Sequence, residues 1–345
     1  LFTSAEDYTI QRWELPSGKK TVWPAHESWI RDIAFLPDGE TVITAGCDDK
    51  IIFWPTAAEK PKPIRTIEAH KGWVRSISVS PDGKLIAATG GTPALFGEVQ
   101  FWDAATRKLV RSITVSYDTL FGASFSADSK QFAFGSADNG VRVLTVADGK
   151  QVMRMDAHSD WSFAATFSLT GTHVISISRD RAMKLSIVES GQFVDNVTSI
   201  TPGALKGGLM AVERRPGQEQ VLTGGSDGTP KLYKVFRTRK RIIGDDFNHI
   251  RSFKPMPGRI FDLQFSPDGK LLVSVSDDMD VKVWDVASGE LKATLKEHKP
   301  MTPQNYPSML YAVTFSRDGK WLATADKVGH IVVWEVATGK KLKTL

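Results

Sequence analysis

Few residues in this chain have the types and spacing that catalysis needs. The segment Gly224–Gly228 has the letters of a GxSxG nucleophile motif, which requires a sharp turn from a strand into a helix. Here the segment stands between two strand-like runs, so Ser226 is expected to lie in a turn and not to act as a nucleophile. The sequence also has no HExxH motif, no phosphate-binding loop and no GxGxxG stretch that opens a helix. We therefore predict no catalytic residue and no enzymatic activity.

Metal and redox chemistry have equally little support. The seven histidines include no HxH or HxxxH pair, so a metal site would need ligands from separate parts of the chain. Cys47 is the only cysteine, which excludes a disulfide framework within the chain and a site with several thiolates. We predict no metal and no cofactor. The cysteine leaves the compartment open, with the cytoplasm favoured over the periplasm or secretion.

The elements that would position any site are repeated along the chain. SPDGK occurs at 80–84 and 266–270, with near matches at 36–40 and 316–320, each between two short apolar runs. Proline presets φ and glycine accepts positive φ, so Pro-Asp-Gly between such runs predicts a β-hairpin. A further strand follows each hairpin and ends at a landmark residue. The landmarks, 41 to 51 residues apart, are Trp13, Trp54, Trp102, Leu144, Ser186, Tyr233, Trp284 and Trp334.

Other residues recur at fixed distances from the landmarks. Most copies have an aspartate six residues before the landmark and a serine or threonine ten residues before it, and three copies have a histidine near the start. This pattern resembles the WD-repeat family of β-propellers over essentially the whole chain. The resemblance implies an all-β fold of four-stranded antiparallel blades. It also implies a structural hydrogen-bond network in each blade, mapped most completely onto His26, Thr44, Asp48 and Trp54. The other expected members are Thr3, Asp7, Trp13, His70, Trp102, His158, Asp180, Ser274, Asp278, Trp284 and Trp334, and His298 could be a fourth repeat histidine displaced by a long loop.

The repeats divide the chain into a single propeller over residues 1–345. The approximate blade repeats are 1–24, 25–65, 66–112, 113–152, 153–197, 198–245, 246–295 and 296–345. The first repeat lacks its first strand, so 3 + 7 × 4 gives 31 strands. Eight blades are favoured over seven, because the first copy keeps Thr3, Asp7 and Trp13 in register. The missing strand is then expected upstream of Leu1, in a longer chain.

Composition is that of a folded protein. Hydrophobic residues make up 41% and charged residues 24% of the chain, which argues against disorder. No apolar run reaches the ~18 residues that suggest a membrane span. The net charge of +5 permits anionic partners without requiring them.

Two positions near the start of each blade predict a binding face. Three residues after the histidine position stand Trp29, Trp73, Thr119, Trp161, Lys206, Arg259 and Met309, and five residues after it stand Arg31, Arg75, Phe121, Phe163, Gly208, Phe261 and Tyr311. Tryptophan, tyrosine and arginine are the types enriched at binding hot spots, and the set holds no acidic residue. The tryptophans could instead pack between blades, whereas the arginines are expected to face solvent.

Two irregular loops are expected on the same face. Residues 92–98 replace the turn aspartate of their repeat and bring Leu95 and Phe96, expected to be exposed, and the loop His298–Ser308 brings Met301 and Tyr306. Each could contact a ligand or cover a neighbouring blade. The basic run Phe236–Arg241 is better explained as a charged edge strand than as a nucleic-acid site.

These features predict a protein-interaction scaffold that binds a protein or peptide, acidic or phosphorylated, on the aromatic and arginine-rich face. Nucleic acid is not an expected partner. One alternative is a sensor or scaffold domain of a larger, bacterial multidomain protein, whose other domains would be partners. A third reading is a propeller with a metal or catalytic site in its channel.

Overall fold

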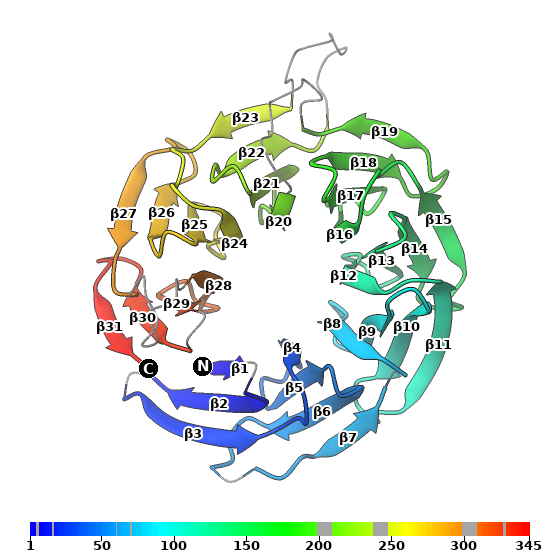
Figure 1. Cartoon of the computed structure of the whole chain (residues 1–345), viewed down its shortest axis with the longest axis horizontal. Coiled ribbons are helices and arrows are strands. Elements are labelled where there is room, and N and C mark those ends of the chain that lie inside the picture. The colour runs from blue at the N-terminus through cyan, green and yellow to red at the C-terminus, as the bar shows by residue number, and fades with distance from the viewer. Residues whose placement is uncertain are drawn as a thin grey trace. The chain divides into compact units, whose positions relative to one another are not determined.

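The chain is built from β-strands alone in the part that the structure describes. The computed structural model describes residues 1–4, 7–15, 17–59, 61–69, 71–198, 209–236, 248–298, 309–326 and 329–345. These ranges contain 31 strands and no helix (Figure 1). The all-β prediction is confirmed, and the strand total is the one that the repeat count gives.

The strands form sheets in which sequence neighbours pair. The first sheet has three strands, β1 (Phe2–Ser4), β2 (Thr9–Glu14) and β3 (Lys19–Pro24). Two four-stranded sheets follow: β4 (Ile30–Phe35), β5 (Thr41–Gly46), β6 (Lys50–Pro55) and β7 (Arg65–Glu68), then β8 (Trp73–Val79), β9 (Leu85–Thr92), β10 (Phe96–Asp103) and β11 (Leu109–Ser116). The next eight strands are β12 (Leu120–Phe125), β13 (Gln131–Ser136), β14 (Val141–Thr145), β15 (Gln151–Met155), β16 (Ser162–Phe167), β17 (His173–Ser178), β18 (Met183–Ile187) and β19 (Phe193–Asn196).

Three more four-stranded sheets complete the described chain. They are β20 (Leu209–Arg214), β21 (Gln220–Gly225), β22 (Lys231–Lys234) and β23 (His249–Ser252); β24 (Ile260–Phe265), β25 (Leu271–Ser276), β26 (Val281–Asp285) and β27 (Leu291–Leu295); and β28 (Leu310–Phe315), β29 (Trp321–Asp326), β30 (Ile331–Glu335) and β31 (Lys341–Thr344). Strands β12–β15 and β16–β19 are two such groups, joined by one parallel bridge between Gly122 and Ala164. Counted over the described ranges, the strands form eight groups.

The described residues divide into two compact units. The first contains Leu1–Ser176 and Ser186–Val194, and the second contains Ile177–Leu185 and Asp195–Leu345. Within the first unit, the first strands of successive groups are neighbours, β4 with β8, β8 with β12 and β12 with β16. Within the second unit, β20 neighbours β24, and β24 neighbours β28. Residues at equivalent places on these first strands are therefore brought close together inside each unit.

The repeated turn sequence fixes the hairpins that start each sheet. Asp82 accepts hydrogen bonds from Ser80 Oγ at 2.7 Å and from the backbone N–H of Lys84 at 3.1 Å. Gly83 has φ = +73°, which glycine adopts without steric cost. Ser266 and Asp268 repeat the hydroxyl-to-carboxylate bond at 2.6 Å. The turn chemistry that the sequence shows thus sets where the first strand ends and the second begins.

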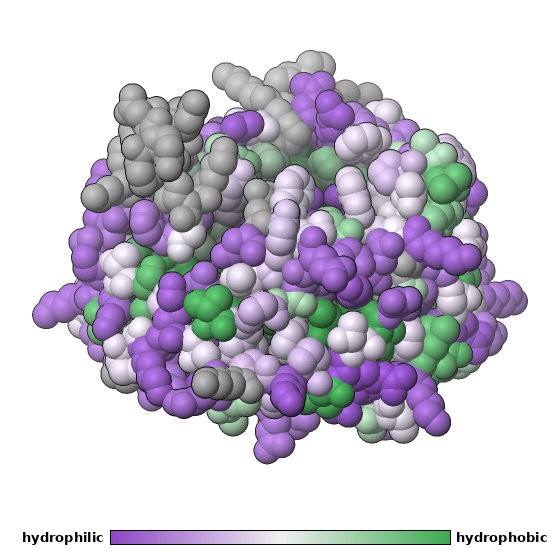
Figure 2. Space-filling view, turned by 60° about the horizontal axis from the view of Figure 1, so that its bottom comes forward, coloured by the Kyte–Doolittle hydropathy of each residue, from purple (hydrophilic) through white to green (hydrophobic). Residues whose placement is uncertain are grey.

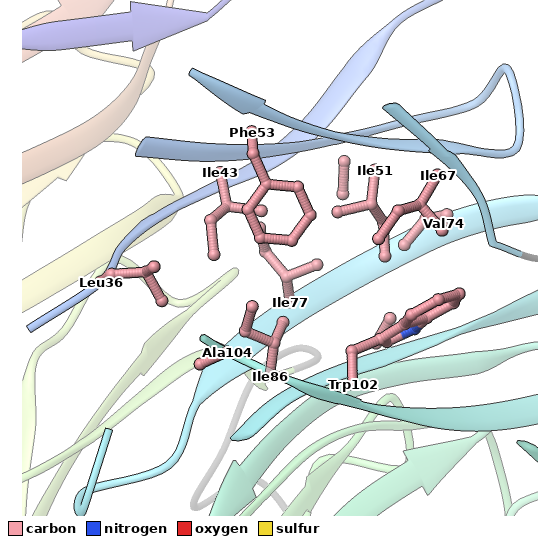
Figure 3. Packing of buried hydrophobic residues seen from close by; sticks show 12 residues of the cluster. Leu36, Ile43, Ile51, Phe53, Ile67, Val74, Ile77, Ile86, Trp102 and Ala104 are labelled. Carbon is pink, nitrogen blue, oxygen red and sulfur yellow. The ribbon is translucent and has the colours of Figure 1, made fainter. Parts of the chain in front are cut away.

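Apolar residues pack between successive sheets. In the first unit, Ile43 and Phe53 are fully buried against Val74 and Ile86 of the next sheet (Figure 3). Burying one such side chain contributes about 1.5–3 kcal/mol. These contacts hold the first strands of the two sheets at a fixed spacing, and the same strands carry the candidate site.

The three-stranded sheet leaves a local difference in packing. Phe125, Phe167 and Phe265 end their first strands and are 9%, 3% and 3% exposed, whereas the equivalent Phe35 is 47% exposed. The Phe35 side chain lies 5.5 Å from Phe2, which belongs to the three-stranded sheet. The phenylalanine at this position is thus buried in three repeats and about half exposed in this one.

Figure 2 shows hydrophobic residues on the visible face as small patches separated by hydrophilic side chains. Within the described ranges, the strands are not accompanied by any apolar helix of membrane-spanning length.

Candidate functional site

The His26 network forms one connected set of hydrogen bonds in sheet β4–β7. His26 Nδ1 lies 2.8 Å from Asp48 Oδ1, and His26 Nε2 lies 2.8 Å from Thr44 Oγ1. Trp54 Nε1 donates to the same hydroxyl at 3.1 Å. Burial alone would raise the pKa of Asp48, but the hydrogen bonds from His26 and the Glu27 N–H lower it below its ordinary value. The Thr44 hydroxyl therefore joins the histidine to the indole.

His298 takes part in an equivalent set in sheet β28–β31. Its Nε2 lies 2.8 Å from Thr324 Oγ1, to which Trp334 Nε1 donates at 3.0 Å. Its Nδ1 lies 3.0 Å from Asp326 Oδ2. This carboxylate stands eight residues before Trp334, while the position six residues before it lies outside the described residues. The search at a fixed spacing therefore missed Asp326.

Other expected members make parts of the network. Trp13 Nε1 donates to Thr3 Oγ1 at 3.1 Å, and Trp284 Nε1 donates to Ser274 Oγ at 3.1 Å. Met256 Sδ lies 3.2 Å from that serine, where other sheets have a histidine. Further bonds of these members include those from His158 to Ser176 at 2.9 Å, from the Thr9 N–H to Asp7 at 3.1 Å, from the Ala182 N–H to Asp180 at 2.9 Å and from the Asp280 N–H to Asp278 at 3.1 Å. Trp102 Nε1 is buried without a hydrogen-bond partner among the described residues, and His70 lies outside them.

Sheet β12–β15 replaces the histidine with a buried ion pair that the sequence analysis did not anticipate. Arg142 Nη1 donates to Asp138 Oδ1 at 3.0 Å, and Ser116 Oγ donates to Asp138 Oδ2 at 2.7 Å. Both charged side chains are 2% exposed. Burial would raise the pKa of Asp138, but the hydrogen bonds from Arg142 and Ser116 hold it well below its usual range. In the sequence, the signal for this ion pair is the spacing of Asp138 and Arg142, four residues apart across a turn.

Acidic residues also link first strands of neighbouring sheets. Asp32 accepts from the Ile77 N–H at 2.8 Å, and Asp262 accepts from the Val313 N–H at 3.0 Å. Burial raises the pKa of Asp262 to about 6, against the opposing effect of its backbone hydrogen bonds. Burial, followed by the charge of Asp262, raises the pKa of Glu213 to about 7.

The candidate binding residues of the first unit lie at the starts of first strands. We call the following set the aromatic–arginine surface: Trp29 and Arg31 at β4, Trp73 and Arg75 at β8, Phe121 at β12, and Trp161 and Phe163 at β16. The strand register shifts at each arginine, between Ile30 and Asp32 in β4 and between Val74 and Ser76 in β8. Each arginine reaches the tryptophan two residues before it. Because these first strands are neighbours, the structure brings the set together.

Direct contacts join the aromatic–arginine surface in two groups, one at β4 and one that extends from β8 to β16. The Arg31 guanidinium lies 4.9 Å from the Trp29 ring centroid, and the Arg75 guanidinium lies 4.6 Å from Trp73 and 5.8 Å from Phe121. The Phe121 centroid is 6.0 Å from Trp161 and 5.6 Å from Phe163. These distances are those of cation–π and aromatic pairs. The three tryptophans remain 41%, 40% and 43% exposed (Trp29, Trp73 and Trp161), so they offer apolar area to solvent.

The second unit has a smaller group with a different charge balance. Arg259 lies 5.4 Å from the Phe261 centroid, which lies 5.3 Å from Tyr311. Arg259 Nε also pairs with Asp277 Oδ2 at 3.0 Å, and the Arg259 N–H donates to Oδ1 at 2.6 Å. The charge of Arg259 is therefore balanced by Asp277. The sequence pattern predicted that Arg259 faces solvent but did not reveal this pairing.

The irregular loops are only partly described. Strands β9 and β10 form a long hairpin with Leu95 at its end, 68% exposed, whereas Phe96 is half-buried and not fully exposed as expected. Gly90 is required beside Trp73, because a Cβ there would collide with the Trp73 carbonyl oxygen. The residues that lie outside the described ranges are Met301, Tyr306, Lys206, Gly208 and positions 237–241 of the basic run.

The structure does not group the remaining described candidates for catalysis or metal binding into a site. Ser226 lies in the turn between β21 and β22, and the described residues after it form a strand. Within the described ranges, no three His, Cys, Asp or Glu side chains are grouped closely enough to hold a metal ion.

Antiparallel four-stranded sheets in which a buried tryptophan bonds to a serine or threonine define a repeat-built β-propeller. The family described as WD domain, G-beta repeat matches residues 18–55, 61–92, 247–285 and 289–335. Four segments of the chain are thus WD40 repeats, in a fold of β-propeller sheets.

Similar proteins agree with this assignment. Nuclear distribution protein nudF of Aspergillus niger is 24% identical over 303 residues, covering 86% of this chain and 59% of that protein. WD repeat-containing protein 18 of Danio rerio is 25% identical over 218 residues, covering 59% of this chain and 49% of that protein. The chain thus spans between 49% and 59% of the length of these relatives. The crystal structure of the computationally designed Ika8 protein shares the fold, with a TM-score of 0.73, 21% identity, and coverage of 93% of this chain and 87% of the designed one.

Proposed function

We propose that this chain is a protein-interaction scaffold that binds an extended segment of a partner protein on the aromatic–arginine surface. The observation that carries the proposal is the series of contacts from Trp73 through Arg75 and Phe121 to Trp161, beside the Trp29–Arg31 pair of the neighbouring strand β4. The three tryptophans keep about two fifths of their area open. Exposed tryptophan and arginine side chains on a rigid support are the usual anchors of protein interfaces. WD-repeat relatives support an interaction role of this general kind.

Rigid first strands supply the precision that such binding needs. Trp73 and Arg75 belong to β8, whose apolar residues Val74 and Ile77 are buried in the core shared with sheet β4–β7. The surface therefore presents its side chains from a backbone that core packing holds fixed. A fixed surface loses little conformational entropy when a partner binds. The proposed activity is binding alone, with no chemical step.

A capture experiment tests this surface against a matched control. The purified chain, the variant Trp73→Ala/Arg75→Ala and the control Leu109→Ser/Val110→Ser are used as baits with one lysate, and the captured proteins are quantified. Leu109 and Val110 are 47% and 51% exposed on β11 of the same sheet, so the control removes comparable apolar area away from β8. We expect a partner that the control retains and the Trp73/Arg75 variant loses. Equal retention by both variants would refute the assignment.

A further inference from the structure

We propose that Arg31 and Arg75 form a subsite for the phosphate group of a phosphorylated side chain on the partner segment. The inference rests on the proposed function and makes it more specific. It follows from the charge balance of these two arginines, their cation–π contacts with tryptophan and the thiol that Arg31 contacts.

Neither arginine has a carboxylate partner within the described residues. Among the other arginines in aromatic or buried surroundings, Arg142 pairs with Asp138 and Arg259 pairs with Asp277. Arg107, 5.6 Å from the Phe53 ring, has no such pair among the described residues. The carboxylate nearest Arg31 in the sequence, Asp32, accepts from Ser76 Oγ and the Ile77 N–H. Asp48 and Glu27 are engaged as well. Asp48 accepts from His26 and from the Glu27 N–H, and Glu27 pairs with Lys50 at 2.8 Å. No carboxylate among the described residues therefore neutralises the positive charge at this end of the surface.

Comparison of two sheets shows why the countercharge is absent. The Cys47 N–H donates to the Trp29 carbonyl at 2.8 Å, as the Asp277 N–H donates to the Arg259 carbonyl at 3.2 Å. Cys47 and Asp277 thus hold equivalent places after the second strand. In sheet β24–β27 this place provides the carboxylate that pairs with arginine. In sheet β4–β7 it provides a thiol, a weak acceptor 3.2 Å from Arg31 Nε.

Arg75 has unsatisfied hydrogen-bonding capacity at the same point. Its Nε is buried and has no hydrogen-bond partner in the part of the chain that the structure describes. Burial, and after it the charge of Arg31, lower the pKa of the Arg75 guanidinium below its ordinary value. Two guanidiniums that repel each other and lack an anion are both stabilised when an anion binds between them.

The chemistry of the pair favours phosphate over a single carboxylate. A phosphorylated side chain carries about −1.5 to −2 charges and three acceptor oxygens, enough to bind two guanidiniums at once. Trp29 and Trp73 hold the two guanidiniums in place by cation–π contacts. Beyond Arg75 the surface continues through Phe121 to Trp161, where an apolar residue next to the phosphorylated one can pack.

Cys47 gives a direct readout of this subsite, because it is the only thiol in the chain and lies beside Arg31. The experiment measures the rate of Cys47 alkylation by iodoacetamide at constant ionic strength. The probes are acetyl-phosphoserine-phenylalanine amide and its glutamate and unmodified serine counterparts. The proteins are the wild type, Arg31→Gln/Arg75→Gln, and Arg259→Gln as the matched control from the second unit.

The phosphoserine probe is expected to protect Cys47 in the wild type and in Arg259→Gln. The glutamate probe should need about tenfold higher concentration than the phosphoserine probe to protect Cys47 equally. This factor corresponds to charge-assisted bonding that is weaker by ~1.4 kcal/mol. Protection should be lost in Arg31→Gln/Arg75→Gln, with the unmodified serine probe inactive throughout.

Each other result overturns a defined part of the proposal. Equal protection by the glutamate probe would show a general anion site and refute the phosphate assignment. Absence of protection by all probes, while Trp73→Ala/Arg75→Ala still loses its captured partner, would refute the subsite and leave the proposed function intact. A single-stranded DNA oligonucleotide that protects as well as the phosphoserine probe would refute a protein partner.

Discussion

The hydrogen bond from Trp54 to Thr44 can be isolated because the chain contains a matched tryptophan without one. Trp54 Nε1 donates to Thr44 Oγ1 at 3.1 Å, whereas Trp102 Nε1 has no partner among the described residues. The two side chains are 2% and 7% exposed and occupy equivalent landmark positions. Replacing either with phenylalanine removes a similar buried volume. The difference between the two substitutions therefore reports the hydrogen bond.

We predict that Trp54→Phe lowers the free energy of unfolding by about 1 kcal/mol more than Trp102→Phe, the net value of one such bond. Thr44→Val should have a larger effect than that difference, since it leaves both Trp54 Nε1 and His26 Nε2 without a partner, at about 1–3 kcal/mol for each buried group. The double variant Thr44→Val/Trp54→Phe should lose less unfolding free energy than the sum of the losses in the two single variants, because both substitutions remove the same bond.

Urea unfolding followed by far-UV circular dichroism measures these differences without relying on tryptophan fluorescence, which the substitutions change. Equal m-values for the variants are required for the comparison. If Trp102→Phe destabilises the protein as much as Trp54→Phe, the bond to Thr44 does not contribute and the account of the network is wrong. Strict additivity in the double variant would contradict it as well.

Three further substitutions test the packing and electrostatics. Phe265→Ala should lower the free energy of unfolding by about 3–5 kcal/mol, and Phe35→Ala by roughly half of that because of its greater exposure; equal losses in urea unfolding would contradict the burial argument. Asp138→Asn leaves Arg142 buried without an anion and should cost about 3–5 kcal/mol, so a thermal midpoint unchanged from wild type would refute the pairing. The pKa of Glu213 is raised to about 7, so the stability that its protonated form provides is present below pH ~4.5 and is lost as the pH rises to about 7. Glu213→Gln should therefore reduce the slope of unfolding free energy against pH in that window. An unchanged slope would count against the assignment.

The sequence was sufficient for the fold because its signals are local. The Ser-Pro-Asp-Gly turns specify the hairpins through their own hydrogen bonds, as Ser80 and Asp82 show. The landmark tryptophans are recognisable because each must end a buried strand, and Trp54 and Trp284 do so. Period and turn chemistry together therefore determine the strand number without knowledge of long-range contacts.

Features that depend on loop geometry or on side-chain direction could not be read in this way. Asp326 reaches His298 from a position that the fixed spacing does not contain. Met256 stands at the histidine position of its repeat, three residues before Arg259, but its contact with Ser274 does not follow from its residue type. The pairing of Arg259 with Asp277 joins residues 18 apart and distinguishes it from Arg31 and Arg75. The register did place the aromatic and arginine residues on neighbouring strands, but which arginines are neutralised required the three-dimensional structure.

Hydrogen–deuterium exchange of the chain with its captured partner tests the central claim most directly. The account predicts that the partner slows amide exchange in peptides covering the starts of β4, β8, β12 and β16, around Trp29, Trp73, Phe121 and Trp161. Exchange in the outer strand β11, which contains Leu109 and Val110, should not change. Protection of β11 with unchanged exchange at those strand starts would show that the partner binds elsewhere, and the aromatic–arginine surface would then not be the binding site.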